Sequence, residues 1–133
     1  MKSFLEHLSI NVSNPDKSFP FYKDLFMFLG YKIIKDKKDG IAFRKEGTPD
    51  FWIKITEPQY TKNRFHRKNT GLNHLAFKVD SKEEVDDFFN KFIQAKNIKT
   101  LYATPKAFSE YESDYYAVFF EDPDRIKIEI LYY

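Results

Sequence analysis

Cysteine is absent from the 133 residues of this chain. Its absence excludes thiolate metal sites, a cysteine nucleophile and disulfides, and it suits a reducing compartment. No segment approaches the roughly 18 consecutive apolar residues that a membrane-spanning helix needs, and the N-terminus lacks the long apolar core of a signal peptide. The sequence therefore predicts a cytoplasmic protein with no membrane partner.

Neither sign of charge is in large excess, because 22 Lys and Arg stand against 20 Asp and Glu. The densest basic run, residues 62–68, holds only four Lys or Arg. A nucleic-acid-binding protein usually concentrates such residues in a stripe, so no nucleic-acid partner is expected. Aromatic residues are plentiful instead. The 15 Phe and 9 Tyr are enough to line a pocket as well as to fill a core.

The sequence contains an internal repeat. The segments that begin at His7 and at His74 align without a gap for 25 positions, at an offset of 67 residues (74 − 7). Alternating apolar residues open each segment and predict a strand with one buried face. Helix caps and stops coincide too, Asn14 with Ser81 and Gly30 with Asn97. Pro20 lies inside the first predicted helix, which predicts either a kink or a helix that starts near Ser18.

Three short strands follow each predicted helix. They are residues 31–35, 41–44 and 51–56 in the first half, and 99–103, 115–121 and 126–132 in the second. Residues 108–114 form a longer loop of the kind that often covers a site. The predicted fold is α+β, a single domain of two βαβββ modules, residues 1–57 and 71–133, with residues 58–70 as a linker. The modules should form a curved mixed sheet with one helix from each module on its outer face.

Strand alternation brings three polar side chains to one face of that sheet. If the apolar residues of these strands lie beneath the helices, His7, His74 and Glu129 emerge on the opposite face. Two imidazoles and a carboxylate match the facial arrangement of iron(II) oxygenases, which leaves coordination positions open, and zinc, manganese and nickel use the same donors. Each residue alone would also suit an ordinary polar surface, which is how we interpret His66.

Several motifs carry a resemblance to a known family. They are the His-Leu-Ser-Ile-Asn-Val opening, the Phe21-Tyr22 pair before Leu29-Gly30, the segment 71–77, and the ending 119–124 with Ile128-Glu129-Ile130. In this order they resemble the vicinal oxygen chelate superfamily, also called the glyoxalase/bleomycin-resistance/dioxygenase superfamily. The resemblance implies a hollow that holds a divalent metal (Fe, Mn, Zn or Ni), with His7, His74 and Glu129 as the candidate ligands. It also implies a homodimer, because members often pair.

The chain departs from the family pattern at two positions. Glyoxalase I-type members supply a fourth ligand, usually Glu, from the last strand of the first module, where this chain places Trp52 and Lys54. Classical lactoylglutathione lyase activity therefore lacks its expected base, and the three-ligand set is more similar to extradiol dioxygenases and fosfomycin-resistance enzymes. Arg125 occupies a turn position where the family usually has Gly.

Two functions of different classes remain open. The first is a metal-dependent enzyme, a lyase, transferase or extradiol-type dioxygenase, acting on a small oxygenated molecule by isomerisation, epoxide opening or ring cleavage. The second is a metal-free small-molecule binding protein of the bleomycin-resistance type, and a pure interaction domain is a third. Lys54 is the candidate catalytic cation, although a solvated lysine fits as well. The candidate pocket residues are Trp52, Tyr102, Tyr111, Tyr115 and Tyr116.

Overall fold

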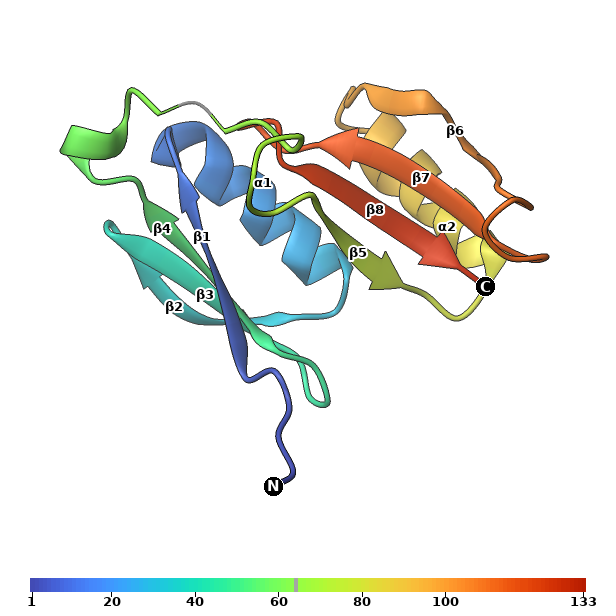
Figure 1. Cartoon of the computed structure of the whole chain (residues 1–133), viewed down its shortest axis with the longest axis horizontal. Coiled ribbons are helices and arrows are strands. Elements are labelled where there is room, and N and C mark those ends of the chain that lie inside the picture. The colour runs from blue at the N-terminus through green and yellow to red at the C-terminus, as the bar shows by residue number, and fades with distance from the viewer. Residues whose placement is uncertain (64) are drawn as a thin grey trace. The chain divides into compact units, whose positions relative to one another are not determined.

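The computed structural model describes residues 1–63 and 65–133. The chain divides into two compact units, Met1–Arg64 and Phe65–Tyr133, which we call module one and module two. Each module holds four strands in a mixed sheet and one helix lying along that sheet (Figure 1). The predicted α+β fold of two βαβββ modules is therefore confirmed. No helix among the described residues is long and apolar enough to cross a membrane.

Module one forms a four-stranded sheet of order β1-β4-β3-β2. Its elements are β1 (His7–Val12), α1 (Pro15–Phe28), β2 (Lys32–Lys37), β3 (Gly40–Arg44) and β4 (Asp50–Ile55). Strands β1 and β4 are parallel, and the other pairs are antiparallel. Helix α1 packs on the sheet through Phe26, whose ring centroid lies 4.6 Å from that of Phe43 and 4.8 Å from that of Phe51.

Module two repeats this topology with the strand order β5-β8-β7-β6. Its elements are β5 (His74–Lys78), α2 (Lys82–Phe88), a π-helical turn η2 (Phe89–Gln94), β6 (Thr100–Ala107), β7 (Tyr116–Glu121) and β8 (Lys127–Tyr132). The short 3₁₀ turn η1 (Pro58–Tyr60) precedes it in the linker. Phe88 of α2 packs on Phe120 of β7 with ring centroids 5.5 Å apart. The equivalent strands β1 and β5 are each parallel to the last strand of their module.

Both helices begin at the predicted caps. The side-chain oxygen of Asn14 accepts hydrogen bonds from the backbone N–H groups of Asp16 (3.0 Å) and Lys17 (3.3 Å). The hydroxyl of Ser81 accepts one from the N–H of Glu84 at 3.2 Å. These side chains satisfy backbone donors that have no partner within the helix. The caps therefore fix both helix starts.

Both helices also end as predicted, with a residue in the left-handed conformation. The φ angle of Gly30 is 82° and that of Asn97 is 58°. In each case the next residue donates its N–H to a carbonyl five residues earlier, Tyr31 to Phe26 at 2.8 Å and Ile98 to Ile93 at 2.9 Å. This bond belongs to the glycine-type helix stop. The repeat therefore extends to the hydrogen bonds at the helix ends.

Of the two alternatives given for the first helix, the later start is wrong, and one strand boundary is also wrong. Helix α1 begins at Pro15 and continues through Pro20 instead of starting near Ser18, which is buried within it. The cap at Asn14 and the packing of the helix outweigh the one N–H that Pro20 lacks. The strand predicted at 99–103 runs to Ala107 as β6, with its pairing to β7 interrupted between Leu101 and Lys106.

The turn between β7 and β8 is built around Asp122. Its carboxylate accepts hydrogen bonds from the N–H groups of Asp124 (2.9 Å) and Ile126 (2.7 Å). Its carbonyl accepts one from the N–H of Arg125 at 3.0 Å. Arg125 adopts φ = 70°, which costs a residue with a Cβ about 1–2 kcal/mol. The turn therefore keeps the conformation that glycine favours although the residue is arginine.

Candidate functional site

The far face of the module-one sheet, opposite α1, carries the first candidate residues. Parallel pairing of β1 with β4 sets His7 beside Asp50, Ser9 beside Trp52 and Asn11 beside Lys54. The alternate residues Ile10 and Val12 are buried, and Ile53 between Trp52 and Lys54 is buried as well. Because cross-strand partners point to the same face, the six residues form one polar surface with Trp52 at its centre.

This surface is hollowed. A cavity of about 300 Å³, the His7 hollow, is lined by Glu6, His7, Ser9, Arg44, Asp50, Trp52 and Lys54. Arg44 holds Asp50 through two bonds, Nε to Oδ1 at 2.9 Å and Nη2 to Oδ2 at 2.6 Å. Its guanidinium lowers the pKa of the Asp50 carboxyl below the ordinary value, chiefly through these hydrogen bonds. The opposite charges of Arg44 and Asp50 thus neutralise each other within the hollow.

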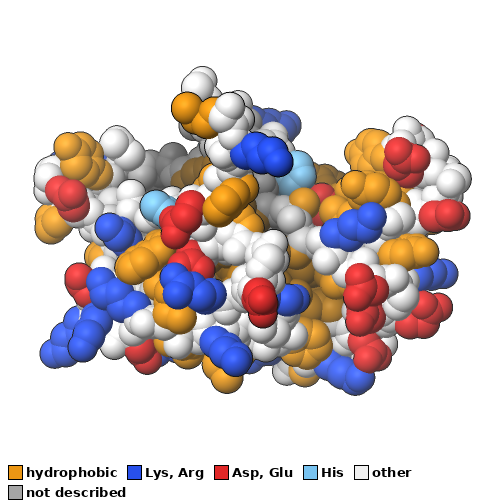
Figure 2. All heavy atoms as spheres, turned by 90° about the horizontal axis from the view of Figure 1, so that it is seen from below, with side chains coloured by type: hydrophobic (Ala, Val, Ile, Leu, Met, Phe, Trp, Pro, Cys, Tyr) orange, Lys and Arg blue, Asp and Glu red, His pale blue; other side chains and the backbone are white. Residues whose placement is uncertain are grey.

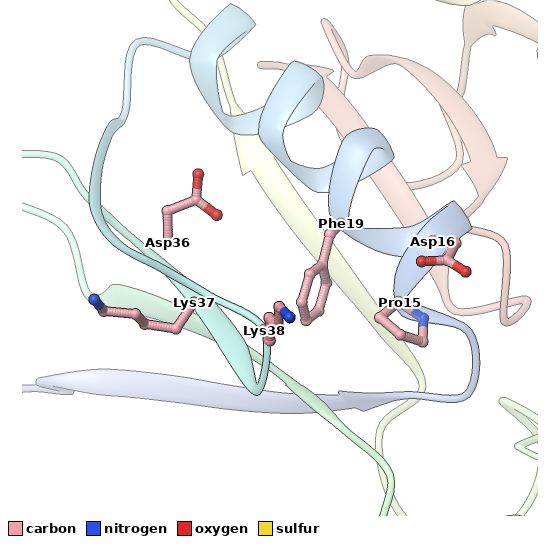
Figure 3. A pocket seen from close by; sticks show the side chains of 6 residues that line it. All are labelled: Pro15, Asp16, Phe19, Asp36, Lys37 and Lys38. Atoms are coloured by element: carbon pink, nitrogen blue, oxygen red, sulfur yellow. The ribbon is translucent and has the colours of Figure 1, made fainter.

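A second hollow of module one, of about 610 Å³, lies between the start of α1 and the end of the β2–β3 hairpin (Figure 3). Its lining mixes acidic and basic side chains with the ring of Phe19. One of these carboxylates, that of Asp36, is already bound by Lys23 of α1 at 2.8 Å. No predicted site residue lines it, so we assign it no chemistry.

The corresponding face of module two carries His74 and Glu129. Strand pairing sets His74 beside Lys127 and Ala76 beside Glu129. Glu129 is only 2% exposed, and its Oε2 atom lies 3.3 Å from Nε2 of His74. Its Oε1 atom accepts a 2.6 Å hydrogen bond from the hydroxyl of Tyr115. A buried carboxylate needs such partners, and here each oxygen has one.

The other ring nitrogen of His74 also faces an oxygen atom. Nδ1 lies 2.7 Å from Oδ1 of Asn73, and Nδ2 of that amide donates to the carbonyl of Arg67 at 3.3 Å. The amide oxygen therefore faces the imidazole. In the tautomer that donates from Nδ1 to this oxygen, Nε2 presents a lone pair to Glu129; in the other tautomer, Nε2–H donates to Glu129. Burial, followed by the charge of Lys127, lowers the pKa of His74 and favours the neutral ring.

Nε2 of His74 and Oε2 of Glu129 lie 3.3 Å apart, and both atoms are electron-pair donors when the ring proton is on Nδ1. Ligands bound at about 2.1 Å in adjacent positions of an octahedral metal lie about 3 Å apart. The chemistry and the spacing of this pair therefore fit a divalent cation. Within residues 1–63 and 65–133, no three His, Cys, Asp or Glu side chains gather around one point. The three-ligand set with His7 thus stays a prediction.

Each of the two imidazoles contacts the side chain of the preceding residue, a repeated feature that the sequence analysis did not predict. Glu6 and Asn73 are equivalent positions of the repeat (73 − 6 = 67), and each precedes its histidine. A carboxylate oxygen of Glu6 contacts Nδ1 of His7 as the amide oxygen of Asn73 contacts Nδ1 of His74. Extending the repeat register by one residue would have revealed the pair. Both rings are thereby oriented with Nε2 free of that neighbour.

Three of the four candidate tyrosines lie on the Glu129 side of the module-two sheet. Besides Tyr115, the ring of Tyr102 packs edge-on against Phe119 at 5.5 Å. The ring of Tyr111 stacks on Phe108, also at 5.5 Å. Phe108 and Phe119 belong to one buried cluster, and Phe119 is the cross-strand partner of Glu129. These aromatic side chains therefore lie around the buried carboxylate of Glu129.

The fourth tyrosine, Tyr116, lies on the opposite face, under the helix. Its hydroxyl donates to Oδ1 of Asp86 on α2 at 2.7 Å. Burial and this carboxylate raise the pKa of Tyr116 to about 12. Adjacent residues of a strand point to opposite faces, so Tyr115 and Tyr116 cannot both line the candidate site. The structure separates Tyr116 from it.

The sequence matches the Glyoxalase/Bleomycin resistance protein/Dioxygenase superfamily over residues 4–130. The chain belongs to this superfamily. The solved structure of a candidate glyoxalase from Bacillus halodurans superposes with a TM-score of 0.88 at 36% identity, covering 99% of this chain and 97% of that one. A lactoylglutathione lyase from Agrobacterium tumefaciens, at 17% identity and a TM-score of 0.67 over 98% and 94% of the chains, shares the fold.

Two relatives are similar in sequence along nearly the whole chain. YqjT of Bacillus subtilis (strain 168), an uncharacterised protein, is 35% identical over 96% of this chain and 97% of its own length. The metallothiol transferase FosB of Shouchella clausii (strain KSM-K16) is 25% identical over 98% of this chain and 80% of its own. The superfamily is thus established by sequence as well as by fold.

Charge on the molecular surface is mixed. On the face drawn in Figure 2, Lys and Arg side chains alternate with Asp and Glu, and no continuous basic stripe is visible. A stripe is the usual footprint of nucleic-acid binding. Neither sign of charge dominates this face.

Proposed function

We propose that this protein is a metal-dependent enzyme acting on a small oxygenated molecule. The divalent cation would be held by His74 and Glu129 of module two, with His7 of module one as third ligand. One observation carries the proposal. Nε2 of His74 lies 3.3 Å from the buried Oε2 atom of Glu129, and both are atoms that bind divalent metals in proteins. Such a pair is stabilised by a cation.

The surrounding residues orient His74 and Glu129. Tyr115 binds one oxygen of Glu129 and leaves the other directed at His74, and Asn73 holds the His74 ring in the required tautomer. A bound divalent cation would supply polarisation of substrate oxygens. These side chains supply orientation. Partners of this kind typically change metal affinity by about 10–100-fold when they are removed.

Among the three open reactions, we favour epoxide opening by transfer of a nucleophile. The relative FosB is named a metallothiol transferase, and it aligns with nearly all of this chain. The centre of β4 carries Lys54 and no carboxylate, which removes the base expected for glyoxalase-type isomerisation. A thiol as nucleophile is therefore the first to test.

A metal-free binding protein is the second candidate. It is supported by the apolar cluster of Phe108, Ala117, Phe119 and Leu131 beside Glu129, which suits the carbon skeleton of a ligand. This function needs no cation, so the two candidates differ in metal content. As a partner for either function we propose a second copy of the chain, which light scattering would detect as twice the monomer mass.

Metal analysis separates the candidates. The protein is purified without chelator, and its metal content is measured by plasma mass spectrometry for the parent, His74→Ala, Glu129→Ala and His7→Ala. Near-stoichiometric metal in the parent, lost in all three variants and retained in His66→Ala, is expected. Absence of metal from the parent after incubation with Fe(II), Mn(II), Zn(II) and Ni(II) would refute the enzyme. Thiol consumption with an epoxide, and oxygen uptake with catechol, then distinguish the reactions.

A further inference from the structure

The stretch of chain that enters β5 (Figure 1) is anchored to the module-two sheet by Arg67. A guanidinium nitrogen of Arg67 donates to a carboxylate oxygen of Glu121 on β7, and 54 residues separate the two in the sequence. Their side chains are only 17% and 22% exposed. Breaking a charge pair that is so far out of water is costly, because removal of one partner leaves the other unpaired. The contact therefore fixes the position of Arg67 on the sheet.

A tyrosine adds to this anchor. Burial opposes the charge of Arg67, but the interactions of its guanidinium with Glu121 and with Tyr102 of β6 more than offset that effect, so the pKa of Arg67 is raised above its ordinary value. Tyr102 lies in the part of β6 whose pairing with β7 is interrupted, and its φ angle is 59°. Arg67 thus interacts with side chains from two strands of the module-two sheet.

Strand pairing explains how this anchor reaches the candidate metal site. Glu121 pairs with Lys127, and Lys127 pairs with His74, so the three residues form one row across β7, β8 and β5. Members of such a row point to the same face of the sheet. Residues 67–73 therefore join the two ends of this row, because this segment is bound to Glu121 at its start and runs directly into His74.

The backbone of Arg67 determines which way the Asn73 amide points. The carbonyl of Arg67 accepts a 3.3 Å hydrogen bond from Nδ2 of Asn73. An amide that donates with its nitrogen on one side presents its oxygen on the other, and here Oδ1 lies 2.7 Å from Nδ1 of His74. With the amide turned over, two oxygens would face each other at Arg67 and the NH₂ group would face Nδ1. The carbonyl of Arg67 therefore selects the orientation of the amide.

This orientation matters for the imidazole because a carbonyl oxygen only accepts hydrogen bonds. An oxygen beside Nδ1 favours the tautomer with the proton on Nδ1, which leaves the lone pair of Nε2 for a cation. An NH₂ group beside Nδ1 would favour the other tautomer, in which Nε2 carries a proton that a metal would have to displace. Arg67 thus acts on Nε2 of His74 through Asn73.

We propose that Arg67 is a positioning residue for His74. Its side chain, held by Glu121, sets the place of its own carbonyl. That carbonyl orients the Asn73 amide, and the amide selects the tautomer of the imidazole. The inference rests on the proposed function only for the statement that Nε2 of His74 binds a metal. The tautomer is a property of the metal-free protein, so it can be measured whether or not that function holds.

Nitrogen NMR of the imidazoles measures the tautomer directly. The chain has three histidines, and His74 is identified as the ring whose signals disappear in His74→Ala. Metal-free parent and Arg67→Met, both with isotopically labelled histidine, are compared at a pH where the rings are neutral. The proton of His74 is expected on Nδ1 in the parent, and the signals should move toward the Nε2-protonated form in Arg67→Met. Unchanged signals in Arg67→Met, or a parent ring already protonated on Nε2, would overturn the proposal.

Arg125→Met is the matched control. Arg125 contacts the same carboxylate, that of Glu121, at 3.5 Å, and its replacement makes the same change of charge. It belongs to the turn between β7 and β8, outside the segment that enters β5, so His74 should keep its parent signals. Arg67→Lys retains a cation opposite Glu121 and should give His74 signals close to those of the parent. A shift in either variant as large as that in Arg67→Met would overturn the assignment.

Glu121→Gln tests the anchor from the other strand, and it keeps the test decisive if Arg67→Met does not fold. Removing the carboxylate charge weakens the hold on Arg67. The His74 signals should therefore move in the same direction as in Arg67→Met, by a smaller amount. Parent-like signals in Glu121→Gln, in a variant that is folded, would count against the anchor and overturn the positioning role.

Metal affinity distinguishes this inference from the proposed function. Arg67→Met should bind metal about tenfold more weakly than the parent, as expected when a partner that orients a metal ligand is disturbed; competition with a chromophoric chelator measures this. If the parent binds no metal but Arg67→Met shifts the tautomer, the proposed function fails and the positioning role holds. If the parent binds metal and Arg67→Met changes neither tautomer nor affinity, the positioning role fails and the proposed function holds.

Discussion

The hydroxyl of Tyr115 donates a 2.6 Å hydrogen bond to Oε1 of Glu129, and this bond joins the aromatic side of module two to its buried carboxylate. The contact is reciprocal, since burial and the neighbouring carboxylate raise the pKa of Tyr115 well above its ordinary value. Tyr115 therefore remains a hydrogen-bond donor at pH values where a free tyrosine already ionises. Glu129 is held with its second oxygen toward His74.

Replacing Tyr115 with Phe should weaken metal binding. The variant keeps the ring and removes the donor, so one oxygen of a buried carboxylate loses its partner, at a cost of about 1.5–3 kcal/mol. A part of this cost should appear as a metal affinity about tenfold lower, measured by competition with a chromophoric chelator. Tyr111→Phe, in the same aromatic cluster, should leave the affinity unchanged. An equal effect of both variants would contradict the role of the hydroxyl.

Replacing Asn73 with Ala should remove the contact that favours the His74 tautomer with its proton on Nδ1. Without the amide oxygen at Nδ1, the proton can move to Nε2 and bond to Glu129. We expect a metal affinity about 10–100-fold lower and a changed pattern of imidazole nitrogen shifts in NMR of the metal-free protein. Asn63→Ala in the linker serves as the control. An unaltered tautomer in Asn73→Ala would refute the positioning role.

Replacing Arg125 with Gly should stabilise the fold. The backbone at this position has φ = 70°, and glycine reaches that conformation without the cost of about 1–2 kcal/mol that a Cβ imposes. Part of this gain is offset by the greater freedom of glycine in the unfolded chain. The free energy of unfolding should rise by about 0.5–1 kcal/mol relative to Arg125→Ala, which retains the Cβ. Urea denaturation of the two variants measures this difference, and no gain over Arg125→Ala would contradict it.

Replacing Tyr116 with Phe should destabilise the protein in a pH-dependent manner. Its bond to Asp86 is worth about 1 kcal/mol. The raised pKa of about 12 means that the folded state retains a proton that an unfolded tyrosine loses near its ordinary value of 10.0. The stabilisation is therefore fully present below pH 10 and is lost as the pH rises toward 12.

Urea unfolding of the parent and Tyr116→Phe at neutral pH and at several alkaline values tests this. The difference in unfolding free energy should shrink as the pH rises above 10. Tyr60→Phe, in the exposed linker turn, is the control for the loss of an exposed tyrosine hydroxyl. A difference that stays constant across this range would show that Tyr116 ionises equally in both states.

Much of the fold was predictable from the sequence, because its determinants are local or periodic. The caps at Asn14 and Ser81 and the stops at Gly30 and Asn97 act within one helical turn. Strand alternation then follows from burial of one face. Pro20 did not delay the start of the helix, because the loss of one hydrogen bond in a packed helix is small compared with burial of its apolar face.

The sequence by itself determined the superfamily, the duplicated βαβββ unit and the type of residue available at each candidate position. Only the tertiary structure decided that the hydroxyl of Tyr115 donates to Glu129 while that of Tyr116 donates to Asp86. It also decided that Nδ1 of His74 faces the amide oxygen of Asn73 and that Lys54 pairs with Gly40 across the sheet. The physical reason is that register, tautomer and ion pairing depend on which strands meet. Contacts between residues far apart in the chain set these, and sequence spacing does not record them.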